Sequence, residues 1–361
     1  MNLDLNDTQG LLQQTVRDFL ERELPFDRIR ELERDGAWDQ PLWKEVCRQG
    51  WLGLPFREEF GGAAGGLVDA GVLLEEFARR AAILPMLETL VCGRVLQTRA
   101  TPELGSEWIP RLLSGETVAV PALLEASDRF GDVNAEVREG RLRGEKSFID
   151  YGQSATHHLV AARDAGELGL FLVDARVEQV KCEPLQHIGR TPQCSAAYAD
   201  APAQRVSGED GYLELIALGR ALSAVQCVGH MQQALDMTIE YAGIREQFGK
   251  RIGSFQAVRH HCANMLMRVS SARLLAFEAL SGLDAGRVDP RQIAAAKAAA
   301  SRAVPEVTML AHQIHGGNGV IEENDLYFFT LRGKERSLAW GTAEECLAEL
   351  AQAIDDPCEW L

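Results

Sequence analysis

Apolar residues recur at helical spacing through the first 114 residues of the chain. A helix that Asp7-Thr8 can cap carries leucine, valine and phenylalanine on one face and ends before Pro25. Amphipathic segments at Trp43 to Leu52 and Val68 to Ala78 predict further helices. We therefore expect a helical domain over residues 1–114.

The pattern changes at Gly115, where short apolar and β-branched runs begin to alternate with turn residues. Glu139-Gly140 separates two such runs and predicts a hairpin. His158 to Ala162 and Leu168 to Val173 are short continuous apolar runs, which favour buried strands. Residues 115–206 are expected to form a small β domain, either a sandwich or a barrel.

The helical pattern returns from residue 207 to the end of the chain. Leu213 to Ala242 and Gln256 to Leu283 predict two long helices. An alanine-rich helix is expected from Gln292 to His312, with a kink or a break at Pro305, and a last helix from Thr342 to Ile354. This order predicts an α+β protein. The three expected domains are residues 1–114, 115–206 and 207–361.

The composition of the 361 residues, 46% hydrophobic and 25% charged, is that of a globular protein. A net charge of −16 argues against nucleic acid or an anionic membrane surface as a partner. We find no run of about 18 apolar residues that would predict a membrane span, and no secretory signal. The eight cysteines are scattered without a CxxC pair. Most of them lie in apolar helical patterns, which favours core positions, and a reducing cytoplasm fits best.

Two segments near the C-terminus combine residues that suit a phosphate ligand. Residues 245–250 read Arg-Glu-Gln-Phe-Gly-Lys and are followed by Phe255-Gln256, while residues 313–319 read Gln-Ile-His-Gly-Gly-Asn-Gly. The planar guanidinium of Arg245 can donate two parallel hydrogen bonds to a pyrophosphate. At Gly316-Gly317 the backbone can approach a phosphate closely, because no Cβ stands in the way.

Together these segments resemble the cofactor-facing half of the acyl-CoA dehydrogenases. The resemblance covers essentially the whole chain, and it is specific from residue 220 to 345. It implies an N-terminal helical domain, a middle β domain and a C-terminal four-helix bundle. It also implies an FAD-dependent enzyme that oxidises the Cα–Cβ bond of an acyl-CoA and passes electrons to an electron-transfer flavoprotein.

The resemblance assigns one set of residues to the FAD of a neighbouring subunit. Arg245 would bind the pyrophosphate, with Phe248 as an apolar shelf beside it, and Gln256 and Gln313 would hydrogen-bond the adenosine and diphosphate part. The remaining members of this predicted set are Ile252, Ile314, Gly316 and Gly317. Without the resemblance, Arg245 would be an ordinary solvated arginine and Phe248 an ordinary core residue.

A second set would hold the flavin ring of the subunit's own FAD. The resemblance assigns Phe148, Asp150, Thr342 and Glu344 to it. The family's Thr-Glu-Pro loop corresponds to residues 123–131, which lack that threonine and proline. Asp150 replaces a hydroxyl residue of the family pattern, and its charge is unfavourable beside a ring that must accept a hydride. An exposed turn acid is the alternative for Asp150.

The position of the catalytic base departs most from the family. Removal of an α-proton needs a general base within hydrogen-bond reach. The family's glutamate corresponds to Trp340, just before Gly341-Thr342, and an indole has no basic lone pair. Some members carry the glutamate before an arginine that matches Arg220, and that position is Gly219 here. Arg220, Trp340 and Gly341 are assigned to the acyl-CoA site, and candidates for a relocated base are Glu322, Glu323 and Glu344.

The departures from the family pattern are selective, because the residues that would contact the FAD of a neighbouring subunit are retained. This favours a non-catalytic subunit that completes the FAD site of a glutamate-bearing partner in a heterotetramer. One alternative is a stand-alone flavoenzyme with a relocated base, assembled with itself as a dimer or tetramer. Another is a flavin-free binding protein of the same fold. The spacing of His260-His261, His312 and His315 does not predict a metal site.

Overall fold

The computed structural model describes residues 5–354, which divide into two compact units. Unit 1 consists of the chain up to Ile29, Leu67–Ala82 and the chain from Arg220 onward. Unit 2 consists of Arg30–Gly66 and Ile83–Gly219. The division into three domains at residues 114 and 206 stays a prediction.

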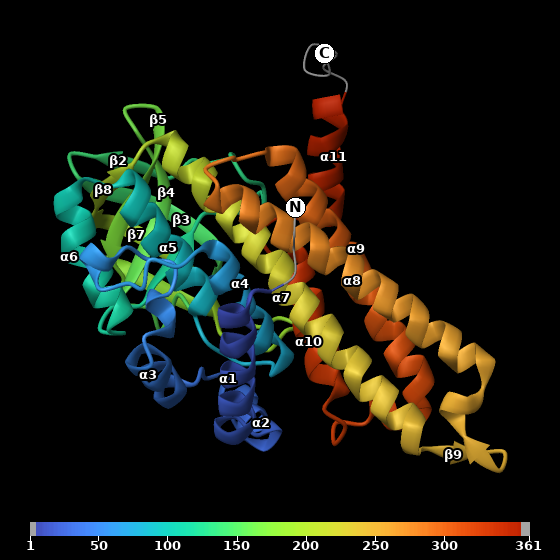
Figure 1. Cartoon of the computed structure of the whole chain (residues 1–361). Coiled ribbons are helices and arrows are strands. Elements are labelled where there is room, and N and C mark those ends of the chain that lie inside the picture. Colours follow the sequence, from blue (N-terminus) through green and yellow to red (C-terminus); the bar gives the residue numbers. More distant parts are fainter. Residues whose placement is uncertain (1–4, 355–361) are drawn as a thin grey trace. The chain divides into compact units, whose positions relative to one another are not determined.

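Unit 1 is almost entirely helical in its described part. Four of its helices lie side by side in Figure 1: α7 (Glu209–Ile244), α8 (Gln256–Asp284), α9 (Pro290–His315) and α10 (Leu326–Leu338). The other helices are α1 (Asp7–Glu23), α4 (Leu67–Arg79) and α11 (Ala343–Ile354), with short 3-10 turns η3 (Ile252–Ser254) and η4 (Gly316–Val320). Strands β9 (Glu246–Gln247) and β10 (Lys250–Arg251) form a hairpin between α7 and α8. The boundary between the two units falls within α2 (Phe26–Asp35) and within α7, so each of these helices has residues in both units.

Two expectations for the helices of unit 1 need correction. The cap of α1 is Asn6 rather than Asp7-Thr8, because the Asn6 side chain accepts the Gln9 amide at 2.9 Å and the Gln9 side chain accepts the Asn6 amide at 3.1 Å. The break expected at Pro305 is wrong, since α9 continues through it. A proline removes a single backbone donor, and the buried face of the helix on either side of it retains its packing.

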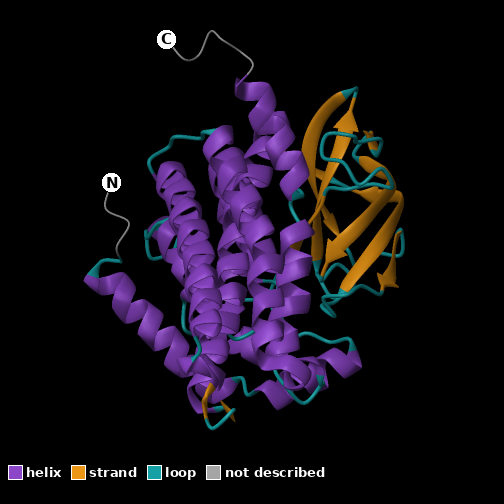
Figure 2. Cartoon of the chain, turned by 90° about the vertical axis from the view of Figure 1, so that its right-hand side faces the viewer, coloured by secondary structure: helices purple, strands orange, loops and turns teal. Residues whose placement is uncertain are grey.

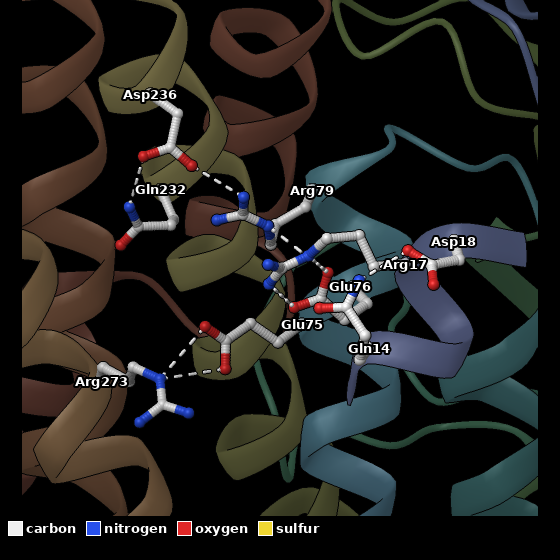
Figure 3. A network of polar contacts seen from close by, with 9 residues as sticks. All are labelled: Gln14, Arg17, Asp18, Glu75, Glu76, Arg79, Gln232, Asp236 and Arg273. Carbon is white, nitrogen blue, oxygen red and sulfur yellow. Dashed lines mark hydrogen bonds and ion pairs between the residues drawn. The ribbon is translucent and has the colours of Figure 1, made fainter. Parts of the chain in front are cut away.

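Two buried glutamates on α4 connect the helices of unit 1 through ion pairs (Figure 3). Glu75 accepts hydrogen bonds from Arg273 of α8 at 3.1 Å, and Glu76 accepts a bidentate pair from Arg17 of α1 at 3.0 and 2.7 Å. Both glutamates are buried, so each depends on its arginine for compensation of its charge. The other members of the network are Gln14, Asp18, Arg79, Gln232 and Asp236.

Helix α7 packs closely against α4. A Cβ added at Gly229 would lie 2.4 Å from the Glu75 carbonyl oxygen, so only glycine permits this approach of α7 to α4. By length and composition alone α7 could cross a membrane, but 78% of its most apolar stretch is buried inside the protein. This is the behaviour of a core helix.

Unit 2 combines three helices with one hydrogen-bonded sheet, drawn in orange in Figure 2. The helices are α3 (Gln40–Arg48), α5 (Met86–Arg99) and α6 (Pro102–Leu113), with 3-10 turns η1 (Trp51–Gly53) and η2 (Glu58–Phe60). The strands are β1 (Ala119–Ala122), β2 (Glu136–Arg138), β3 (Arg141–Asp150), β4 (His157–Asp164), β5 (Glu167–Asp174), β6 (Val180–Leu185), β7 (Gln193–Pro202) and β8 (Gln204–Ser207).

The strand order in the sheet is β6-β7-β3-β2-β4-β5-β8, with β1 paired to β4. The hairpin predicted at Glu139-Gly140 is confirmed, because β2 and β3 pair antiparallel on either side of it. Helical segments, a middle sheet and further helices confirm the α+β class.

Most of the described cysteines occupy core positions, as expected. Cys47, Cys92, Cys194, Cys227 and Cys346 are buried. Cys182 and Cys262 are half-buried, and Cys358 lies outside the described residues.

Candidate functional site

The hairpin after α7 displays the first predicted set of cofactor residues. The Ile252 amide donates to the Arg245 carbonyl at 2.8 Å, which closes the hairpin, and α8 begins at Gln256. Phe248 is 91% exposed and its ring meets Phe255 edge-on at 6.1 Å. The alternative that Phe248 is an ordinary core residue is therefore wrong within this chain. A large apolar ring on a hairpin indicates a surface that something else covers.

The glycine segment lies at the same end of unit 1 as the hairpin. The rings of Tyr241 and His315 stand 4.4 Å apart at an interplanar angle of 33°. Tyr241 is one helical turn before Arg245, and His315 comes directly before Gly316, so this contact brings the two segments together. Gly316 has φ +59° and ψ −140°, a conformation that is essentially restricted to glycine. A Cβ at Gly316 or Gly317 would meet nothing within 4 Å, so the backbone here is open to a ligand.

We call the combined region the hairpin surface, defined by Arg245, Phe248, Gln256, Gln313 and Gly316-Gly317. The side chains of Arg245, Gln256 and Gln313 are exposed and have no hydrogen-bond or ion-pair partner among residues 5–354. An unpaired guanidinium, two free amides and an open glycine backbone suit the diphosphate of a dinucleotide such as FAD. Ile252 and Ile314 are half-buried beside them.

The loop that should carry the catalytic base holds Trp340 in the left-handed region, with φ +64°. Arg220 donates from Nε to the Trp340 carbonyl at 3.1 Å and makes a bidentate pair with Glu349 of α11 at 2.5 and 2.7 Å. A Cβ at Gly341 would lie 3.3 Å from the Arg220 guanidinium, so glycine allows the close contact. The Trp340 side chain is 8% exposed. Arg220 is therefore occupied in positioning this loop.

Thr342 and Glu345 form a capping box at the start of α11. The Glu345 carboxylate accepts the Thr342 amide at 2.7 Å, and the Thr342 hydroxyl accepts the Glu345 amide at 3.2 Å. The Thr-x-x-Glu spacing of residues 342–345 is the sequence signature of such a cap. Glu344 is exposed on the same helix. The predicted cofactor contacts of Thr342 and Glu344 stay predictions.

A buried lysine that the sequence analysis did not single out contacts the end of α10, just before the loop that carries Trp340. Lys297 is fully buried, and its ammonium donates to Ser301 Oγ at 2.9 Å and to the carbonyls of Arg336 and Ser337 at 2.7 and 3.2 Å. Those carbonyls are in the last turn of α10, whose negative end favours a cation. Burial lowers the pKa of Lys297 to about 8. A lysine in an alanine-rich helix gives no hint of this role.

The β-domain residues of the second set lie in unit 2. Phe148 has φ +57° and is 47% exposed, at an irregularity in the pairing of β3 with β7. Asp150 lies at the end of β3, where its carboxylate accepts Gln193 Nε2 at 2.8 Å. The alternative of an exposed turn acid is therefore wrong for Asp150. What it faces in an assembled protein stays a prediction.

Glu125 remains from the family's Thr-Glu-Pro loop and has a structural role. It accepts Lys146 Nζ at 2.7 Å and the amides of Asn134 and Ala135 at 2.9 Å. Partial burial alone would raise the pKa of Glu125, but the bond from Lys146 and the amide bonds hold it below its usual value. A carboxylate so fully paired is unsuited to act as a base.

Among residues 5–354, no group of three or more histidine, cysteine or carboxylate side chains could hold a metal ion.

Comparison with known proteins agrees with these features. The model of the acyl-CoA dehydrogenase N-terminal domain matches residues 6–116, and that of the C-terminal domain matches residues 208–354. The acyl-CoA dehydrogenase IpdE2 of Mycolicibacterium smegmatis is 27% identical, over 97% of this chain and 100% of the relative.

Two solved structures are similar over nearly their whole length. The ChsE4-ChsE5 complex of Mycobacterium tuberculosis has a TM-score of 0.93 at 26% identity, with 99% of each chain covered. The Tcur3481-Tcur3483 steroid ACAD G363A variant has a TM-score of 0.91 at 28% identity, with 98% of this chain and 99% of that chain covered. With both terminal domains matched, the chain belongs to the acyl-CoA dehydrogenase family of FAD-dependent oxidoreductases.

Proposed function

We propose that this chain is a non-catalytic subunit of a heteromeric acyl-CoA dehydrogenase and completes the FAD site of a glutamate-bearing partner subunit. The observation that carries the proposal is Trp340, which stands directly before Gly341-Thr342 where the family has its base. An indole cannot accept the α-proton of a thioester. The proton would be taken by the partner's glutamate.

The hairpin surface supplies this chain's contribution. Arg245 would hold the pyrophosphate of the partner's FAD, the amides of Gln256 and Gln313 would orient the adenosine and diphosphate part, and Phe248 would exclude water. Bound FAD supplies the hydride acceptor for oxidation of the acyl Cα–Cβ bond. Because the three polar side chains have no partners within the described part of the chain, no internal ion pair must break before they bind.

The substrate site of this chain would be closed. Arg220 is engaged by Glu349 and by the Trp340 carbonyl, and the Trp340 side chain is larger than the glutamate that it replaces. The similarity to ChsE4-ChsE5, named as a complex of two proteins, and to a steroid ACAD supports a heteromeric assembly that acts on bulky acyl-CoAs. The seven described cysteines are free thiols, which supports a cytoplasmic location.

The test is a flavin count with and without a partner. The chain is expressed alone and together with glutamate-bearing acyl-CoA dehydrogenase subunits encoded in the same genome, and FAD released by denaturation is measured against protein. We expect about one FAD per heterodimer and little FAD in the chain alone. One FAD per chain in the isolated protein would contradict the proposal, as would a stable complex without flavin.

Variants separate the roles within the complex. Arg245→Ala should weaken FAD binding by about tenfold to a hundredfold, because a hydrogen bond to a charged group contributes about 1.5–3 kcal/mol. Arg268→Ala, at an exposed arginine of α8 that pairs with Glu306, is the matched control and should leave FAD affinity unchanged. Equal losses in both variants would refute a specific role for Arg245.

A second pair of variants tests the missing base. Trp340→Phe and Glu344→Gln should both leave the turnover of the complex within about a factor of a few of the parent value. If Glu344→Gln abolishes turnover while FAD remains bound, Glu344 is a relocated base and the chain is itself catalytic.

A further inference from the structure

Two cysteines occupy neighbouring strands of the unit 2 sheet. Cys182 is on β6 and Cys194 on β7, and these strands pair antiparallel with Cys182 opposite Ala196 and Pro184 opposite Cys194. The cysteines are therefore diagonal neighbours, two positions apart in register. Since alternate residues of a strand share a face, both side chains point to the same face of the sheet.

The two thiols lie close enough to interact, and they are not equivalent. Cys182 is half-buried, whereas Cys194 is buried. The interaction with Cys194 lowers the pKa of Cys182, and the same interaction together with burial raises the pKa of Cys194. Each of the other five described cysteines has its pKa raised by burial. Cys182 is therefore the described cysteine with the most thiolate character.

The position of β6 permits the sulfurs to approach. Among the described strands, β6 is at the edge of the sheet and pairs only with β7, so it can shift without breaking a second ladder. Diagonal positions have Cα atoms about 7–8 Å apart, and a disulfide needs about 4.4–6.8 Å, so a displacement on the order of 1–2 Å is sufficient.

We propose that Cys182 and Cys194 form a redox-active pair that hydroperoxides convert to a disulfide between β6 and β7. A partly exposed thiol beside a buried second thiol is the arrangement of an attacking and a resolving cysteine.

The chemistry balances with a hydroperoxide as the oxidant. The Cys182 thiolate attacks one oxygen of hydrogen peroxide, the O–O bond breaks, and the hydroxide that leaves takes up a proton to become water. The Cys194 sulfur then attacks the sulfenic sulfur of Cys182, the S–O bond breaks, and a second water leaves with the proton of Cys194. Two thiols and one peroxide give one disulfide and two waters, with two electrons transferred to the peroxide.

The disulfide would act on the part of the sheet next to Asp150. Cys194 pairs with Ile149 of β3, and the neighbouring Gln193 donates to the Asp150 carboxylate at 2.8 Å. A link that draws β6 toward Cys194 would restrain this end of β7 and with it the contact between Gln193 and Asp150. A reductant would reverse the change.

The experiment measures which thiols of the native full-length chain are oxidised during treatment with hydrogen peroxide. After treatment the protein is denatured, free thiols are alkylated, and its mass gives the number of labels on the eight cysteines. We expect the loss of two labels, their recovery with dithiothreitol, and a linked peptide pair that contains Cys182 and Cys194.

Single variants identify the roles of the two sulfurs. Cys182→Ser should abolish the fast reaction, whereas Cys194→Ser should leave a sulfenic acid that dimedone traps at Cys182. Cys262→Ser, at the other half-buried cysteine, should behave like the parent. Because peptide mapping of the parent needs no variant, it tests the pair even if a variant fails to fold. Retention of all labels, or a linked pair that excludes either cysteine, would overturn the proposal.

Discussion

Replacement of Lys297 by methionine should change how the stability of the protein depends on pH. The ammonium of Lys297 is fully buried and bonds to Ser301 and to two carbonyls in the last turn of α10. Methionine has a similar length but carries neither a charge nor a donor. The substitution therefore removes one titrating group and leaves the volume of the core nearly unchanged.

The magnitude follows from the change in pKa on folding. Burial lowers the pKa of Lys297 from 10.5 to about 8. A difference of about 2.5 units, at about 1.36 kcal/mol per unit, amounts to roughly 3 kcal/mol. Between about pH 8 and 10.5 the unfolded chain holds the proton and the folded chain does not, so the free energy of unfolding rises with pH. This contribution is fully present above about pH 10.5 and is lost as the pH falls through about 8.

The assay is urea unfolding followed by circular dichroism at about pH 7, 8, 9 and 10 for the parent and Lys297→Met. The free energy of unfolding of the parent should rise relative to the variant by about 2 kcal/mol between pH 8 and 10, and the difference should be flat below pH 7. Other groups that titrate in this range do so in both proteins and cancel. Lys334→Met, at an exposed lysine of α10, is the control and should show no such slope. A constant difference between the parent and Lys297→Met would refute the reasoning.

Three further substitutions test the packing of unit 1. Arg273→Ala leaves the buried carboxylate of Glu75 without its arginine and should lower the free energy of unfolding at neutral pH by about 3–5 kcal/mol, as measured by urea unfolding. The control Arg268→Ala should lower it by less than about 1 kcal/mol. Similar losses in the two variants would contradict a buried ion pair. Asp284→Ala removes the acceptor of two amides at the start of α4 and should cost about 1–2 kcal/mol, with faster hydrogen exchange confined to that turn. Burial lowers the pKa of His230 to about 3, so it contributes stability above about pH 6.5 that is lost as the pH falls through 3. His230→Gln should therefore lose less stability than the parent between about pH 6 and 4, and parallel acid-unfolding curves would refute this.

The pattern of apolar residues was sufficient for most of the secondary structure. Helices α4, α7 and α8 and the β2–β3 hairpin form where spacing and turn residues predicted them, because these signals depend on neighbours within one or two turns. The residues of the hairpin surface were identifiable for a similar reason, since Arg245 and Gln256 flank one short hairpin and Gln313 precedes a glycine pair. The cap of α1 was misplaced by one residue because Asn6, Asp7 and Thr8 can all cap a helix.

The remaining features depend on contacts between residues that are far apart in the chain. Local spacing does not reveal that Lys297 meets carbonyls of α10, that Arg273 reaches Glu75, or that Arg220 is held by Glu349. Each of these groups would be solvated in an isolated helix, where its charge would have little effect on stability. Burial in the folded chain removes water from them, which makes a specific partner necessary and shifts the pKa of Lys297. Periodicity identifies which face of a helix is buried, but the groups that meet there are determined by the packing of the whole domain.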